Sequence, residues 1–118
     1  MAKLTEINRE LKKMKDVVLG KEYDLSFAFI SPAKIKLLNF TYRSINKPTD
    51  ILSFPLSKKE GEIYICKSEA RKEAKKFDRK YENFLRFLFI HGLVHLKGYD
   101  HGSTMENIEA KFRKQFGI

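Results

Sequence analysis

The sequence predicts an α+β fold, in which a small mixed β-sheet of three to four strands packs with about five helices. Hydrophobic periodicity gives the order helix, strand, helix, strand, strand and then helices, which is typical of that class. The chain has 118 residues, about one domain by length. Its 42% hydrophobic and 13% aromatic content can form a core, which excludes wholesale disorder. We therefore expect residues 1–118 to form a single domain without a linker or internal repeat.

The first half of the chain predicts two helices around a strand. Residues 4–18 form an amphipathic pattern that ends before Gly20. Residues 23–30 alternate between apolar and other side chains, as a strand does. Ser31 is a candidate N-cap with Pro32 at the first helical position, and this second helix ends near Arg43. The apolar positions that repeat at helical spacing in the first helix are Leu4, Ile7, Leu11, Met14 and Val18.

Two short strands are predicted in the middle of the chain. After a loop over residues 44–48, residues 51–54 form an apolar segment that we expect Pro55 to stop. Proline cannot donate to a ladder of hydrogen bonds, so this strand should lie at an edge. A turn over residues 58–61 leads to a second strand over residues 62–66.

The last part of the chain predicts three helices. Ser68 is the expected cap of a very polar helix over residues 69–80. A long helix begins near Asn83 and is apolar on nearly all sides, which predicts that it is buried. Gly98 ends it and allows the chain to turn back. Residues 104–116 form a final amphipathic pattern with Ile108, Phe112 and Phe116 facing inward.

The charge balance bears on partners. The chain has 24 Lys and Arg against 15 Asp and Glu, a formal net charge of +9. Such a surplus attracts a polyanion through counterion release, although a solvated basic surface explains it equally well. The basic residues are spread widely, including Lys12, Lys13, Lys15, Lys34, Lys36, Arg71, Lys72, Lys75, Lys76, Arg79, Lys80 and Arg86.

Cysteine content and hydropathy predict the compartment. The chain has one Cys, so an intramolecular disulfide and the disulfide-rich secreted classes are excluded. No apolar run reaches the roughly 18 residues that a membrane-spanning helix needs. The N-terminus is amphipathic and charged without the apolar core of a signal peptide. We expect a cytoplasmic protein that does not bind membranes.

All three histidines lie within eleven residues, with the spacing His-x3-His-x2-Gly-x2-His. His91 and His95 are one helical turn apart, so their rings leave the same face of the buried helix. The reversal at Gly98 can bring His101 back over that face. Three imidazoles with a fourth position open form a zincin-like catalytic zinc site, with one Zn²⁺ per chain. The alternative is that each His is a core residue bonded to a carbonyl or a carboxylate.

The residue after the first histidine decides the type of chemistry. Metzincin peptidases share this spacing but carry Glu directly after the first His, where it activates the zinc-bound water. Here that position is Gly92, which cannot accept a proton. Peptide hydrolysis is therefore disfavoured, and a metal that polarises a phosphoryl oxygen suits the basic chain better. A metzincin-like metallohydrolase whose base comes from elsewhere stays an alternative.

Besides the histidine motif over residues 91–101, the sequence has two further notable stretches, Leu38–Arg43 with Lys47–Pro55 and Gly61–Cys66. Together these three stretches resemble the YbeY family of bacterial rRNA maturation factors. The match runs in the family's order from about Leu38 to His101, more than half of the chain. Two departures are Glu62, where the family usually has Asp, and the lack of an initial strand, which predicts a smaller sheet. The stretches are Leu38–Arg43 followed by Lys47–Pro55 (Lys-Pro-Thr-Asp-Ile-Leu-Ser-Phe-Pro), then Gly61–Cys66 (Gly-Glu-Ile-Tyr-Ile-Cys), and His91–His101.

The resemblance implies a single-strand-specific, metal-dependent endoribonuclease. It implies roles in 3′-end maturation of small-subunit rRNA and in ribosome quality control, with the small ribosomal subunit as a partner. It also implies that His91, His95 and His101 bind zinc and that Arg43 lines the cleft and serves activity. A guanidinium can clamp a phosphate, although Arg43 could instead face solvent or pair with Asp50. Glu62 receives no role.

The polar helix is the candidate RNA contact. Its residues Lys72, Lys76 and Arg79 could follow an RNA backbone, or form a solvated face with Ala70, Ala74 and Phe77 turned inward. Cys66 is more consistent with a buried thiol than with a fourth zinc ligand. A remaining alternative is a non-catalytic ribosome- or RNA-binding factor with a structural metal.

Overall fold

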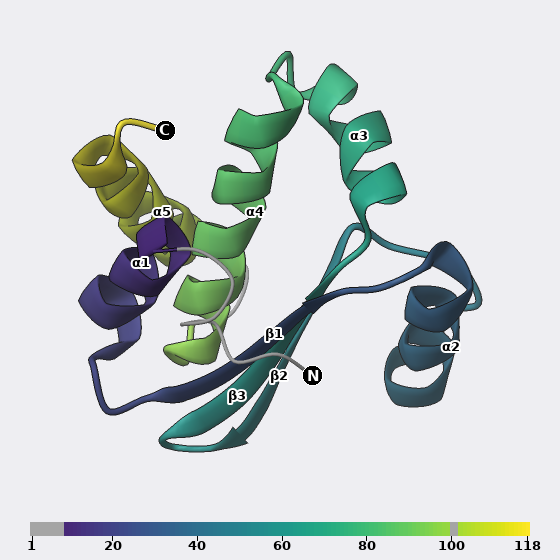
Figure 1. Ribbon diagram of the computed structural model, residues 1–118, viewed down its shortest axis with the longest axis horizontal. Coiled ribbons are helices and arrows are strands. Elements are labelled where there is room, and N and C mark those ends of the chain that lie inside the picture. The colour runs from purple at the N-terminus through teal and green to yellow at the C-terminus, as the bar shows by residue number, and fades with distance from the viewer. Residues whose placement is uncertain (1–8, 100–101) are drawn as a thin grey trace.

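A three-stranded mixed sheet carries helices on both faces (Figure 1). The computed structural model describes residues 9–99 and 102–118, and the predicted order of elements is confirmed there. The start of the first predicted helix, residues 4–8, lies outside the described residues. The elements are α1 (Arg9–Leu19), β1 (Asp24–Phe29), α2 (Pro32–Arg43), β2 (Ile51–Ser57), β3 (Glu60–Ile65), α3 (Lys67–Lys76), α4 (Tyr81–Leu96) and α5 (Ser103–Phe116).

The sheet has the order β1-β3-β2, with β1 parallel and β2 antiparallel to the central β3. The expectation that β2 lies at an edge is confirmed. The expectation that Pro55 stops it is wrong, because the strand continues to Ser57 with an irregularity just after the proline. Pro55 is tolerated because an edge strand has one side without a ladder.

The two faces of the sheet bury different cores. On one face, alternate residues of β1 and β3, including Phe27 and Ile63, pack against α1, α4 and α5. On the other face, Leu52 of β2 packs with Ile35 of α2 and with Cys66. This alternation places each strand residue on one side, and it decides which residues can meet α4.

Helices α2 and α4 begin and end close to the predicted residues. Ser31 caps α2, since its side chain accepts a hydrogen bond from the Lys34 amide at 3.2 Å. Gly98 has φ +110°, so the expected reversal after α4 is confirmed. Within the described residues, no helix is long and apolar enough to cross a membrane.

The polar helix differs from its prediction. Helix α3 begins at Lys67 after the N-cap residue Cys66, so Ser68 lies within the helix and does not cap it. The helix ends at Lys76, because Asp78 has φ +52° and breaks the helical path. Phe77 therefore leaves the inner face that holds Ala70 and Ala74, and its side chain is 54% exposed.

One predicted surface charge is buried. Lys15 of α1 is 5% exposed, and its ammonium donates to the carbonyl oxygens of Gly20, Lys21 and Tyr23 at 3.2, 3.3 and 3.1 Å. It also forms an ion pair with Asp16 at 2.7 Å. Lys15 thus stabilises the turn between α1 and β1 through these hydrogen bonds, and it is not part of the basic surface.

Candidate metal centre and cleft

His91 and His95 line one cleft on α4, as their spacing predicts. The cleft has a volume of about 610 Å³ and lies between α4, β2 and the end of α2. Its wall also includes Arg43, Asp50 and Ser53. The structure therefore brings together two predicted ligands and the predicted catalytic arginine.

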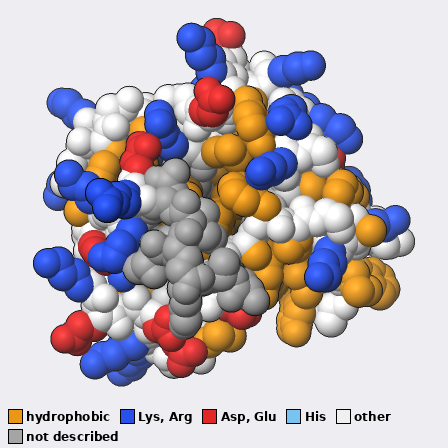
Figure 2. Space-filling model, in the orientation of Figure 1, with side chains coloured by type: hydrophobic (Ala, Val, Ile, Leu, Met, Phe, Trp, Pro, Cys, Tyr) orange, Lys and Arg blue, Asp and Glu red, His pale blue; other side chains and the backbone are white. Residues whose placement is uncertain are grey.

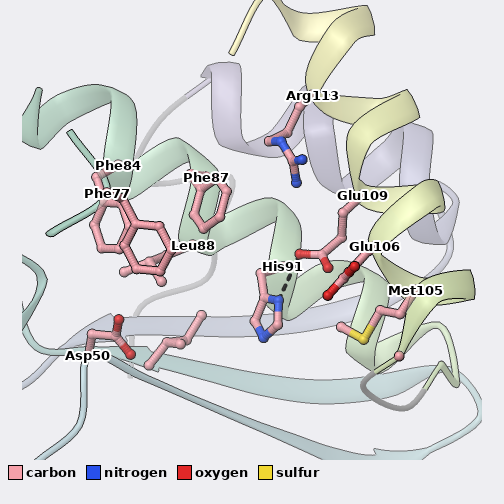
Figure 3. A pocket seen from close by; sticks show the side chains of 12 residues that line it. Asp50, Phe77, Phe84, Phe87, Leu88, His91, Met105, Glu106, Glu109 and Arg113 are labelled. Atoms are coloured by element: carbon pink, nitrogen blue, oxygen red, sulfur yellow. Dashed lines mark hydrogen bonds and ion pairs between the residues drawn. The ribbon is translucent and has the colours of Figure 1, made fainter. Parts of the chain in front are cut away.

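Each of the two imidazoles is held through its Nδ1 atom. The Nδ1 of His91 lies 2.7 Å from Oε1 of Glu109, which α5 supplies (Figure 3). The Nδ1 of His95 lies 3.1 Å from the carbonyl oxygen of Tyr99. Both acceptors require a proton on Nδ1, which leaves Nε2 as the nitrogen that would bind a metal in each ring. A ring oriented in this way by a carboxylate or a carbonyl is the usual arrangement of metal-binding histidines.

Glu109 is a site residue that sequence analysis missed. Its side chain is only 6% exposed and forms an ion pair with His91 when that ring is charged. The available signal is its position: an acidic residue on the inward face of α5, between Met105 and Phe112. An isolated charge is rarely buried without a partner, so that position pointed to a partner across the helix interface.

Gly92 is required by close packing of α4 on the sheet. A Cβ at this position would lie 2.9 Å from Oγ of Ser53 and 3.0 Å from Cδ1 atoms of Ile51 and Ile63. The sequence shows that no carboxylate is present here, and the structure adds that even a Cβ would crowd three side chains of the sheet. The site cannot use the general base of a metzincin peptidase.

Arg43 is the last residue of α2 and is exposed at the cleft. Within residues 9–99 and 102–118 it forms no ion pair, with Asp50 or any other carboxylate. Burial, and next the charge of Glu73, raise the pKa of the Asp50 carboxyl. The guanidinium is thus available to an anion in the cleft.

The structure describes some of the remaining candidates and not others. His101 is outside the described residues, although the adjacent Gly102 lines a cavity together with His91. The described residues alone hold no group of three metal-ligating side chains. Glu62 pairs across the strands with Phe54, and although Phe54 and Tyr42 line the cleft, Glu62 does not. Cys66 is buried, as expected, in the core beneath α2.

On the face shown in Figure 2, the basic residues do not gather on one patch. Figure 2 shows lysine and arginine side chains spread around the face, with acidic side chains among them. Lys72 and Lys76 are exposed on α3 and pair with Glu69 and Glu73 at 2.9 and 3.0 Å. Arg79 instead lies over the ring of Phe87, 4.6 Å from its centroid.

Comparisons with known proteins cover almost the whole chain. The family model described as Endoribonuclease YbeY matches residues 2–116. A protein named Endoribonuclease YbeY from Thermosipho melanesiensis is 38% identical over 99 residues, which is 82% of this chain and 72% of the relative. Its namesake from Thermotoga maritima is 34% identical over 116 residues, 94% and 77% of the two chains.

The fold has a counterpart among solved structures. The solution structure of TM1509 from Thermotoga maritima matches with a TM-score of 0.67 and 30% sequence identity. The match covers 99% of this chain and 86% of that one. Sequence motifs, family model and fold agree, which confirms the resemblance that the histidine motif indicated. The chain belongs to the Endoribonuclease YbeY family, and is thus a hydrolase that acts on RNA.

Proposed function

We propose that the chain is a zinc-dependent endoribonuclease that cuts single-stranded RNA, and that residues 1–118 are one metal-dependent hydrolase domain. Family membership supports the nuclease activity. The observation that carries the metal is the pair His91 and His95, each with its Nδ1 held by the protein. We further propose that it acts in 3′-end maturation of small-subunit rRNA and in ribosome quality control, with the small ribosomal subunit as its partner.

In this proposal, one zinc ion is held by His91, His95 and His101. The first two rings present Nε2 because Glu109 and the Tyr99 carbonyl fix their Nδ1 protons. Zinc in such a site supplies Lewis acidity and lowers the pKa of water, which is the chemistry that phosphodiester hydrolysis needs. The side chains of the cleft then have to hold the scissile phosphate in one orientation next to the metal.

Arg43 is the residue that we assign to the phosphate. It shares the cleft with His91 and His95, is exposed, and comes from a different element than the histidines. A guanidinium in the same cleft as the two rings can hold a phosphate by two parallel hydrogen bonds and stabilise charge that develops on it. Lys72, Lys76 and Arg79 remain the proposed contacts to the rest of the RNA strand.

The test is cleavage of a labelled single-stranded RNA by wild type and His95→Ala, purified side by side and checked for folding by circular dichroism. We expect wild type to cut and the folded variant not to cut. Equal cleavage by both, or none by either, would contradict the nuclease. Salt-dependent RNA binding without cleavage would then favour a binding factor with a structural metal.

A second pair of variants tests Arg43. Arg43→Lys keeps the charge but loses the planar two-point grip, so we expect kcat to fall. Lys36→Ala is the matched control, because it removes one exposed positive charge from the same helix outside the cleft. An unchanged kcat in Arg43→Lys would mean that Arg43 acts only through its charge, and an equal loss in Lys36→Ala would mean that the effect is not specific to the cleft.

A further inference from the structure

A second cavity adjoins the metal centre. It has a volume of about 550 Å³ and shares His91 and Asp50 with the cleft described above. Its opposite end is aromatic: Phe77, Phe84 and Phe87 line it (Figure 3). The cavity therefore extends from the proposed metal centre to an apolar, aromatic wall.

Helical spacing fixes how close this wall is to the metal centre. Phe84, Phe87 and His91 are separated by three and four residues, so they lie on one face of α4. With a rise of about 1.5 Å per residue, Phe87 is about 6 Å from His91 along the helix axis. A short stretch of extended nucleic acid can reach both.

The aromatic wall is a cluster of three rings in mutual contact, because the Phe77 ring also lies 5.8 Å from that of Phe87, at 39°. The rings of Phe84 and Phe87 stack at 5.4 Å and 15°, and Phe77 stacks on Phe84 at 5.5 Å and 25°. Although Phe84 covers one face of Phe77, the Phe77 side chain is still 54% exposed. A flat apolar ring that is held by a stack and open to solvent is the platform on which proteins bind unpaired nucleobases.

Two guanidinium groups lie beside this stack. Those of Arg79 and Arg113 are 4.6 and 5.0 Å from the centroid of the Phe87 ring. Neither forms an ion pair within the part of the chain that the structure describes. Burial, and next the charge of Arg113, lower the pKa of Arg79. Arg79 lies outside the cavity and donates to the Asn83 side chain, whereas Arg113 lines the cavity, so the guanidinium that an anion in the cavity can meet is that of Arg113.

The charged residues of the cavity are distributed along it. Glu106 and Glu109 of α5 lie on the side of His91, and Glu109 is engaged with that ring, whereas Asp50 lies below the Phe77–Phe84 pair (Figure 3). Arg113 projects from α5 near Phe87, so a phosphate next to a base stacked on the aromatic wall would bind at this guanidinium.

We propose that this cavity is a nucleotide subsite of the nuclease, in which a base next to the cut bond stacks on Phe77 and the neighbouring phosphate binds the Arg113 guanidinium. The inference rests on the proposed function and assigns its specificity for single strands to Phe77. A base paired in a duplex cannot present its face to the ring, whereas an unpaired base can.

The test uses short single-stranded RNAs that carry one abasic nucleotide at successive positions around the cut bond. For wild type, we expect the abasic sugar at one position to raise both Kd and KM about fivefold or more, the loss of one stacked base. Phe77→Ala should show that loss with intact RNA and no further loss with the abasic RNA. Phe77→Leu, which keeps an apolar side chain on Phe84, should behave like Phe77→Ala.

The controls come from the same chain. Phe40→Ala removes a ring that is also 54% exposed but lies on α2, away from the cavity, and should change nothing. Arg113→Gln should lower the salt dependence of RNA binding more than Lys111→Gln on the same helix. The proposal is overturned if Phe77→Ala matches Phe40→Ala, or if the abasic effect survives in Phe77→Ala.

The outcome separates this subsite from the nuclease itself. If wild type binds the RNAs but does not cut them, the proposed function fails, while the Kd values still decide the subsite. If His95→Ala abolishes cleavage and Phe77→Ala leaves Kd and KM unchanged, the nuclease stands and the subsite is refuted.

Discussion

Replacement of Glu109 by Gln is expected to weaken zinc binding about tenfold. The carboxylate lies 2.7 Å from Nδ1 of His91, and its side chain is 6% exposed, so water does not replace it. A hydrogen bond to a charged group contributes about 1.5–3 kcal/mol and a neutral one about 0.5–1.5 kcal/mol. Because Gln keeps the size and loses the charge, the difference of about 1.4 kcal/mol corresponds to a tenfold change in affinity.

The assay is a competitive zinc titration against a chromophoric chelator, which compares wild type, Glu109→Gln and Glu106→Gln. Glu106→Gln is the control, since it removes an exposed charge one turn earlier on α5 and lines the same cavity. We expect Glu106→Gln to bind zinc within about twofold of wild type, as long-range charge effects are weak at a surface. Equal affinities for the two variants would refute the view that Glu109 orients His91 for a metal.

Three further changes test the packing and the charges around the site. Gly92→Ala should lower Tm by about 4 °C. The added methyl overpacks α4 against the sheet at a cost of about 1–3 kcal/mol, which exceeds the gain of about 1 kcal/mol in helix propensity. A raised Tm would contradict the close contact of Gly92 with the sheet. Lys15→Leu should lower the free energy of unfolding in urea by about 2 kcal/mol or more, since three carbonyl oxygens lose their donor, whereas the exposed Lys13→Leu should change it little. The hydrogen bond from Lys15 lowers the pKa of Asp16 below 3.8, so its stabilisation is present at neutral pH and is lost as pH falls through that lowered pKa. The difference in urea midpoint between wild type and Asp16→Asn should therefore shrink as the pH is lowered below 3.8, and a constant difference would show that the ionised pair does not stabilise the fold.

Local signals explain the parts of the fold that the sequence predicts. Ser31 and Pro32 start α2 because a capping hydroxyl and a fixed φ act within one turn. His91 and His95 share a face because helical geometry alone places them there. Gly98 reverses the chain through its own positive φ. None of these features depends on distant residues.

Features that depend on distant contacts were missed. Pro55 continues β2 because that strand lies at an edge with a free side, which only the order of strands decides. Glu109 meets His91 across 18 residues, through the packing of α5 on α4. Lys15 is buried because the turn that follows α1 folds three carbonyl groups over it.

The C-terminal end of the polar helix α3 was also predicted wrongly. Its composition predicts a helix through residue 80, but the chain leaves the helix at Lys76 so that α4 can begin at Tyr81. Phe77 is consequently placed on Phe84 and open to solvent. Helix ends are set by the packing of the next element as much as by propensity.

The most direct test of the account is a zinc titration of metal-free protein during cleavage of single-stranded RNA. The protein is stripped with a chelator, checked for folding, and returned to zinc in steps while the cleavage rate and bound metal are measured. The account predicts a rate that rises in proportion to bound zinc and reaches its maximum at one ion per chain, with no recovery in His95→Ala. Full cleavage by the metal-free protein, or zinc uptake that leaves the rate unchanged, would contradict it.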